Sequence, residues 1–136
     1  MSLVSTSRSL VFAGLLFGLL LAGCSGGGSD EYRVTGSVTF DGQPVEQGEM
    51  IFFTSEMQPY VTRITAGQFE CYLPEGRKRV EITATRESPT PAPDGLPNYE
   101  SYIPAAYNTD SELTAQIEAG RENTLNFDLQ PRPTGR

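Results

Sequence analysis

The chain has 136 residues, of which 10 are Lys or Arg and 17 are Asp or Glu, so its formal net charge is −7. This length is that of one domain, and the negative charge argues against nucleic acid as a partner, because a phosphate backbone is bound through clustered positive charge. The chain has no His, which excludes His-based triads and His metal sites, and its 2 Cys residues are too few for a disulfide scaffold.

The first 23 residues are typical of an export signal. Arg8 supplies a short positive region, and the uncharged, Leu-rich run 10–22 has the length of the apolar segment of a signal peptide. A membrane-spanning helix needs roughly 20 apolar residues, and this run is shorter. We therefore expect residues 1–23 to be a signal peptide that is removed from the mature chain.

The apolar run ends in the sequence Leu21-Ala22-Gly23-Cys24, which resembles the lipobox of bacterial lipoproteins. The resemblance implies that Cys24 is diacylated and becomes the acylated first residue of the mature chain. The alternative is an ordinary secretory signal in which the Cys is incidental.

Lipidation at Cys24 would fix the protein to a membrane, because two or more acyl chains hold a protein stably on a bilayer. The segment 24–31 is rich in Gly and Ser and would form a flexible tether. Ser25 resembles the residue that sorts lipoproteins to the outer membrane. We expect the protein to lie in the cell envelope, on the outer rather than the inner membrane.

From residue 32 the sequence changes to the alternation of apolar and polar residues that is typical of β-strands. In the first such run, 32–40, Gly36 takes a place on the apolar face. A glycine at such a place usually marks a bulge or the close approach of another backbone segment. Asp41-Gly42 then predicts a turn.

Further short runs with strand character follow, and turn signals such as Ala66-Gly67 separate them. These runs are 50–53, 60–65, 68–73, 78–85, 113–117 and 124–129. Seven short strands predict an all-β fold, a seven-stranded antiparallel β-sandwich of the transthyretin-like or immunoglobulin-like kind, over residues 32–129. Residues 130–136 are expected to be a flexible tail.

The Pro-rich stretch 86–111 interrupts the alternation and reads as a loop. A connection of this length in a compact domain is either functional or mobile. Tyr99, Tyr102 and Tyr107 within it form a candidate surface for an envelope protein partner, because Tyr offers a large contact area at low entropic cost and Pro stiffens a loop. The alternative is that these rings fold back and cover one end of the sandwich.

Four short motifs occur in order along the first half of the predicted domain. They are Val34-x-Gly36-x-Val38, Asp41-Gly42-Gln43-Pro44-Val45, Gly67-x-Phe69 and Leu73-Pro74-x-Gly76-x-x-x-Val80-x-Ile82. In this order they resemble the carboxypeptidase regulatory-like, or transthyretin-like, β-sandwich superfamily, although Arg79 departs from the aromatic residue usual in the last motif. Residues 103–108, 113–114 and 126–129 resemble a bacterial subgroup of lipoproteins with this fold. The resemblance implies a module without catalytic activity and does not name a ligand.

Transthyretin-like folds also include hydroxyisourate hydrolases, which rely on His residues and on a C-terminal tetrapeptide of the Tyr-Arg-Gly-Ser type. This chain has no His and ends in Pro-Thr-Gly-Arg, so the resemblance does not extend to that enzyme.

Two candidate sites have simple structural alternatives. Cys71 could be a reactive thiol, but its phase on the run 68–73 points inward and favours a small buried residue. Asn108, Asp110 and Glu112 could offer oxygens to calcium, but the glycine of the best calcium-loop motif is absent, and turn formation explains these residues equally well.

The remaining charged residues single out no reaction. The 17 acidic residues supply many carboxylate pairs, and nothing distinguishes one pair from a solubilising surface. The cluster Arg77-Lys78-Arg79 is expected to pair with local acids, with contact to anionic lipid as the alternative.

These observations together predict a lipid-anchored envelope module with a non-catalytic binding or structural role and with no metal or cofactor. A carrier of calcium or a small ligand is the first alternative, and a carboxylate-based envelope enzyme is the second.

Overall fold

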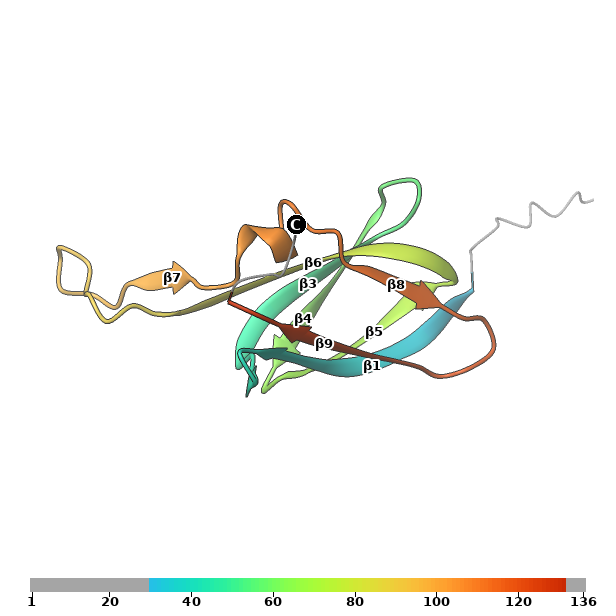
Figure 1. Cartoon of the computed structure of the whole chain (residues 1–136), viewed down its shortest axis with the longest axis horizontal. Coiled ribbons are helices and arrows are strands. Elements are labelled where there is room, and N and C mark those ends of the chain that lie inside the picture. The colour runs from blue at the N-terminus through green and yellow to red at the C-terminus, as the bar shows by residue number, and fades with distance from the viewer. Residues whose placement is uncertain (1–29, 132–136) are drawn as a thin grey trace, which may run out of the picture.

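Residues 30–131 are described in a computed structural model, and within them the fold is all-β apart from one short 3₁₀ helix (Figure 1). The predicted signal peptide 1–23, Cys24 and most of the predicted tether lie outside the described residues, as does nearly all of the predicted tail. Within residues 30–131 no helix has the length and apolar character that crossing a membrane requires.

The strands form where the sequence alternates. They are β1 (Glu31–Phe40), β2 (Gln43–Pro44), β3 (Gln47–Phe53), β4 (Pro59–Thr65), β5 (Gln68–Pro74), β6 (Gly76–Glu87), β7 (Tyr99–Ser101), β8 (Thr114–Ile117) and β9 (Asn123–Leu129), and the 3₁₀ helix η1 (Ala105–Tyr107) lies between β7 and β8. All seven predicted runs are strands. The two additional strands, β2 and β7, are too short to show an alternation of their own.

The strands pair into one curled sheet with two limbs. In the β1 limb, β1 pairs with β2, β5 and β9, and in the β3 limb, β3 pairs with β4 and β6, while β7 and β8 pair with β6. The limbs are joined at the turn between β4 and β5, where Thr65 pairs with Gln68. The sheet folds over at this turn, so one face of each limb is turned toward the other.

One strand pair differs from the predicted antiparallel sheet. β9 runs parallel to β1, in register from Val34 opposite Asn123 to Phe40 opposite Leu129, whereas the other strand pairs of the described chain are antiparallel. β8 lies in the β3 limb, so the chain crosses to the β1 limb before β9 begins and does not form a hairpin. Alternation predicts which side of a strand is buried, but it does not predict the direction of the neighbouring strand.

Two predicted turns are confirmed by their backbone angles. Asp41 and Gly42 have φ of 51° and 75°, and Ala66 and Gly67 have φ of 49° and 74°. Two successive residues with positive φ form the mirror-image turn whose twist matches a β-hairpin. These turns place β2 beside β1 and carry the chain from β4 into β5.

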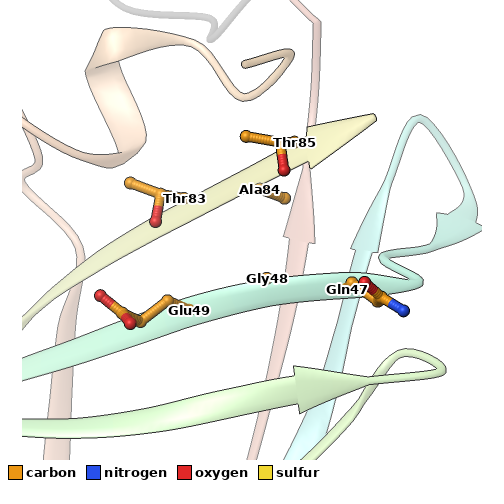
Figure 2. Close-up of a pocket in the computed structure, with 6 residues that line it drawn as sticks. All are labelled: Gln47, Gly48, Glu49, Thr83, Ala84 and Thr85. Atoms are coloured by element: carbon orange, nitrogen blue, oxygen red, sulfur yellow. The ribbon is translucent and has the colours of Figure 1, made fainter. Parts of the chain in front are cut away.

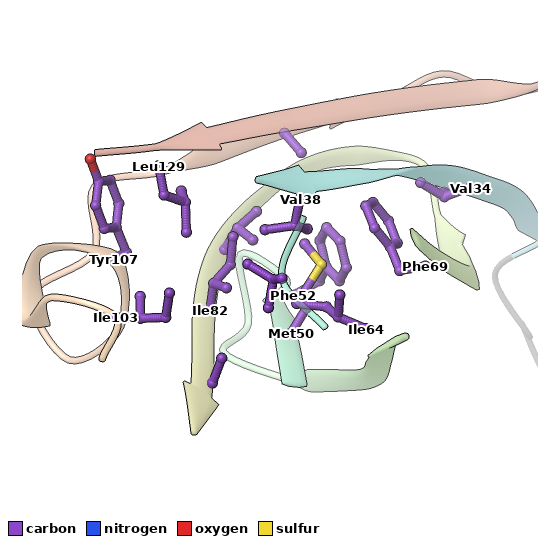
Figure 3. Packing of buried hydrophobic residues seen from close by; sticks show 14 of the residues in the cluster. Val34, Val38, Met50, Phe52, Ile64, Phe69, Ile82, Ile103, Tyr107 and Leu129 are labelled. Carbon is purple, nitrogen blue, oxygen red and sulfur yellow. The ribbon is translucent and has the colours of Figure 1, made fainter. Parts of the chain in front are cut away.

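In the described part of the chain, one hydrophobic core lies between the two limbs (Figure 3). The β1 limb contributes Val34, Val38, Phe69, Leu73 and Leu129, and the β3 limb contributes Met50, Phe52, Ile64, Val80, Ile82, Ala84, Ala115 and Ile117. Phe52 and Phe69 meet across the core with ring centroids 6.1 Å apart. Ile103 and Tyr107 lie at one end of this core, near Leu129.

Of the two reasons that the sequence offers for Gly36, a bulge or the close approach of another backbone segment, the structure shows the second. A Cβ atom at this position would lie 1.7 Å from the backbone oxygen of Leu125 on β9 and 2.8 Å from the Phe69 ring. Real Cβ atoms do not come this near to other heavy atoms. The parallel pairing of β9 with β1 therefore depends on a residue without a side chain at position 36.

Candidate functional site

The composition of the stretch 86–111 predicts a loop, but the structure differs. The stretch forms part of a hairpin, and after it a segment that covers one end of the core. β6 continues past Ala84, where its pairing with β3 ends, and pairs with β7 instead: Thr85 lies opposite Ser101 and Glu87 opposite Tyr99. Residues 85–101, here called the arm, project from the body of the molecule as a two-stranded ribbon (Figure 1).

Backbone hydrogen bonds continue along the arm beyond its paired strands. The N–H of Ser88 donates to the carbonyl of Asn98 at 2.7 Å, and the N–H of Ala92 donates to the carbonyl of Leu96 at 3.0 Å. At the base of the arm, Arg86 and Glu100 form an ion pair at 2.9 Å. Four prolines fix φ along the tip, at positions 89, 91, 93 and 97. A segment ordered in this way loses little conformational entropy when it binds.

The three tyrosines of the predicted surface have three different environments. Tyr99 is 65% exposed on the arm, and Leu96, which the sequence did not single out, is 60% exposed at its tip. Tyr102 lies at the base of the arm, edge-to-face with the Phe40 ring at 5.4 Å and below the Arg86 guanidinium at 5.3 Å. Burial raises the pKa of its phenol above the ordinary value.

Tyr107, which the sequence analysis placed on the candidate partner surface, is buried in the structure. Tyr107 is the last residue of η1; its ring is buried in the core, and its hydroxyl accepts a hydrogen bond from the N–H of Gln130 at 3.0 Å. For this residue the alternative interpretation is correct, because the ring covers one end of the core. The exposed apolar groups of the arm are therefore Tyr99 and Leu96.

Two small hollows lie at the two ends of the arm. The first, of about 200 Å³, lies near its base, where β3 and β6 separate (Figure 2). It is lined by Gln47, Gly48, Glu49, Thr83, Ala84 and Thr85. The second, of about 210 Å³, lies at the tip and is lined by residues 87–89, 91 and 95–98. Sites for cofactors and drug-sized molecules usually measure about 300–1,000 Å³, so these hollows are of a size for single side chains of a partner.

The arm also offers unpaired backbone groups. Within residues 30–131, no third strand pairs with the arm, so both of its edges are open. An open strand edge is a template for pairing with an extended segment of another chain.

The predicted basic cluster 77–79 separates into three environments. Arg79 pairs with Glu81 at 2.6 Å and lies over the Phe53 ring, in agreement with pairing to a local acid. Arg77 is exposed, whereas Lys78 is only 2% exposed and donates from Nζ to the carbonyl of Glu75 at 2.8 Å. Burial lowers the pKa of Lys78 below its ordinary value, although nearby carboxylates act in the opposite direction.

Of the three residues considered as oxygen ligands for calcium, Asn108 makes hydrogen bonds at the end of η1. The Asn108 amide donates to the carbonyls of Ile103 and Pro104 at 3.3 and 3.1 Å, and its oxygen accepts from the N–H of Thr109 at 2.8 Å. Asp110 and Glu112 are exposed. In the described part of the chain, no group of three His, Cys, Asp or Glu residues is arranged to hold a metal ion.

Cys71 is half-buried on β5, and its pKa is raised to about 11, chiefly by burial and further by the charge of Glu70. The thiolate is the nucleophile, so we expect iodoacetamide to label Cys71 at pH 8 about two orders of magnitude more slowly than an ordinary thiol. The rate should rise about tenfold per pH unit up to pH 11. Mass spectrometry of the labelled peptide measures this rate.

The raised pKa of Cys71 also makes the stability of the folded protein depend on pH. Because folding raises the pKa above its ordinary value of 9.0, the thiol's contribution to stability is complete below pH 9 and is lost as the pH rises through about 11. Labelling at pH 8 as fast as that of free cysteine would contradict a buried thiol.

Comparison with known proteins assigns no family. No family model matches the chain, and no curated protein matches it significantly. A DUF3823 family protein from Parabacteroides merdae ATCC 43184 has a TM-score of 0.41 and 20% identity over 75% of this chain and 46% of its own. A 9R-lipoxygenase from Cyanothece PCC8801 has a TM-score of 0.34 and 14% identity over 78% of this chain and 18% of its own. This chain thus spans less than half of either protein, and neither likeness indicates a function.

Proposed function

We propose that the protein is a lipid-anchored, non-catalytic module of the cell envelope that presents the arm to a protein partner. In this proposal the two limbs are the layers of a transthyretin-like β-sandwich, which serves as the rigid base of the arm. The observation that carries the proposal is the position of the arm, whose tip and the start of β1 lie at opposite ends of the molecule (Figure 1).

The length of the tether determines which end faces the membrane. Cys24 and Glu31, the first residue of β1, are 7 residues apart, and an extended chain spans at most about 3.3–3.6 Å per residue. A lipid on Cys24 would therefore hold the start of β1 within about 25 Å of the bilayer surface. The arm would point away from that membrane, toward the proteins that surround it.

The form of the arm favours a protein as its partner. A two-stranded ribbon standing alone is only marginally stable, so the arm adds little to the stability of the core. It combines two exposed apolar side chains, Leu96 and Tyr99, with hollows of side-chain size and open strand edges. These are features that recognise side chains and backbone together.

The double variant Leu96→Ala, Tyr99→Ala tests this function. After in-cell crosslinking, we expect it to recover at least about tenfold less of the envelope protein that co-purifies with the wild type, because apolar anchors dominate such interfaces. Its melting temperature should hardly change, since both side chains are exposed.

A matched control is the double variant Val61→Ala, Tyr72→Ala, which removes side chains that are 59% and 54% exposed on the body. It should recover the partner like the wild type. Equal losses from the two double variants would place the contact elsewhere than on the arm.

A further inference from the structure

A third hollow, of about 330 Å³, lies near the start of β1, far from the arm. One wall is the segment 54–60, which joins β3 to β4 and includes the start of β4, and the other is the segment 74–78, where β5 passes into β6. Pro74 in the second wall pairs with Glu31, the first residue of β1. The volume falls in the range of sites for small ligands.

The buried cation of this hollow is Lys78. Its Nζ carries three hydrogens, and the carbonyl of Glu75, at 2.8 Å, accepts one of them. None of the ion pairs found within residues 30–131 includes Lys78. A buried charge is costly unless it is paired, so an oxyanion at this position would be favourable.

Gly76 lies beside the Lys78 ammonium. Its φ is +100°, a conformation that favours glycine, and a Cβ atom there would lie 3.7 Å from Nζ. Any larger side chain would therefore touch the ammonium. With glycine, residue 76 places no side chain against Nζ.

Carboxylates stand at the rim of the same hollow. Glu56 is exposed, and its Oε1 accepts a hydrogen bond from the Ser55 hydroxyl at 2.8 Å. Glu75, also exposed, lines the opposite wall. A simple anion near Lys78 would be repelled by these carboxylates, and a simple cation near them would be repelled by Lys78 and Arg77.

We propose that this hollow binds a small zwitterion, whose oxyanion pairs with Lys78 Nζ and whose ammonium group faces the Glu56 carboxylate. The hydroxyl of Thr54 and the amide of Gln58, which also line the hollow, are available for further hydrogen bonds. The proposal depends on the charges of this hollow and is independent of the function of the arm. Two sources carry this chemistry, a free amino acid and the phosphoethanolamine headgroup of a lipid.

Calorimetric titration of the mature protein in an uncharged detergent tests the proposal. The probes are glycine and glycerophosphoethanolamine, a phosphodiester like the lipid headgroup, with acetate and ethylammonium as ligands of a single charge. We expect one of the zwitterions to bind at least about tenfold more tightly than either single-charge ligand, because a hydrogen bond to a charged group contributes about 1.5–3 kcal/mol. Tighter binding of glycerophosphoethanolamine would assign the lipid headgroup as the source, and tighter binding of glycine would assign an amino acid.

Three variants locate the site. Lys78→Met and Glu56→Gln should each weaken zwitterion binding at least about tenfold, and Glu46→Gln, which changes an exposed residue between β2 and β3 outside this hollow, should leave it unchanged. If Lys78→Met fails to fold, Glu56→Gln decides, because its carboxylate is exposed. Zwitterions that bind no better than acetate and ethylammonium, or that bind Glu56→Gln like the wild type, would overturn the proposal.

Discussion

Replacing Gly36 with alanine is expected to lower the free energy of unfolding by about 4 kcal/mol or more, which is a large part of the stability of a domain of this size. The added Cβ atom would lie 1.7 Å from the Leu125 oxygen and 2.8 Å from the Phe69 ring. Both neighbours are held in place, Leu125 by the pairing of β9 with β1 and Phe69 by the core. The chain can accept the new atom only by moving β9 away from β1.

Urea denaturation of Gly36→Ala measures this loss, and Gly120→Ala is the matched control. Gly120 has a φ of +72° and no heavy atom within 4 Å of the added Cβ position. We expect it to lose only about 1–2 kcal/mol, the cost of holding an alanine in the left-handed conformation. Equal midpoints for the two variants would show that β9 does not approach β1 as closely as described.

Replacing Cys24 with serine is expected to release the protein from the membrane fraction almost completely. In the lipoprotein interpretation the Cys24 sulfur carries the diacyl group, and serine offers no sulfur for it. Each buried acyl CH₂ contributes about 0.8 kcal/mol to membrane binding, so the loss of whole chains changes the partition by many orders of magnitude. Intact-protein mass spectrometry of the membrane and soluble fractions measures the acyl mass and the distribution together.

Cys71→Ala is the control for this variant, because Cys71 lies on β5 and is the other Cys of the chain. It should keep the acyl mass and the membrane location. A Cys24→Ser protein with normal acyl mass would refute the lipoprotein interpretation.

The strands of the body could be predicted from the sequence because one face of each strand is buried. In β1 the alternation of Val34 and Val38 with polar residues predicted the buried face, and the gap at Gly36 indicated either a bulge or the close approach that the structure shows. The pairing of β9 with β1 could not be predicted in the same way. It depends on which limb the chain enters after β8, and local alternation contains no information about that.

The arm was missed because both of its strands are largely exposed. From Thr85 onward β6 has no buried face, and β7 has only three residues, so neither leaves an apolar alternation. Because no apolar alternation surrounds these residues, the sequence also does not predict that Tyr99 is exposed and Tyr107 is buried. The sequence prediction for Lys78 was based on its charge. The alternation in β6 gives the correct result, because the phase that places Val80 inside also places Lys78 inside.

The measurement that tests the central claim most directly is in-cell photo-crosslinking from a photoreactive phenylalanine analogue at Tyr99, compared with the same probe at Tyr72. Tyr72 is 54% exposed on β5, outside the arm, and Tyr99 is 65% exposed on the arm. The proposed function predicts one dominant crosslinked envelope protein from position 99 and none from position 72. Diffuse crosslinks from position 99, or the same products from both positions, would contradict a partner-binding arm.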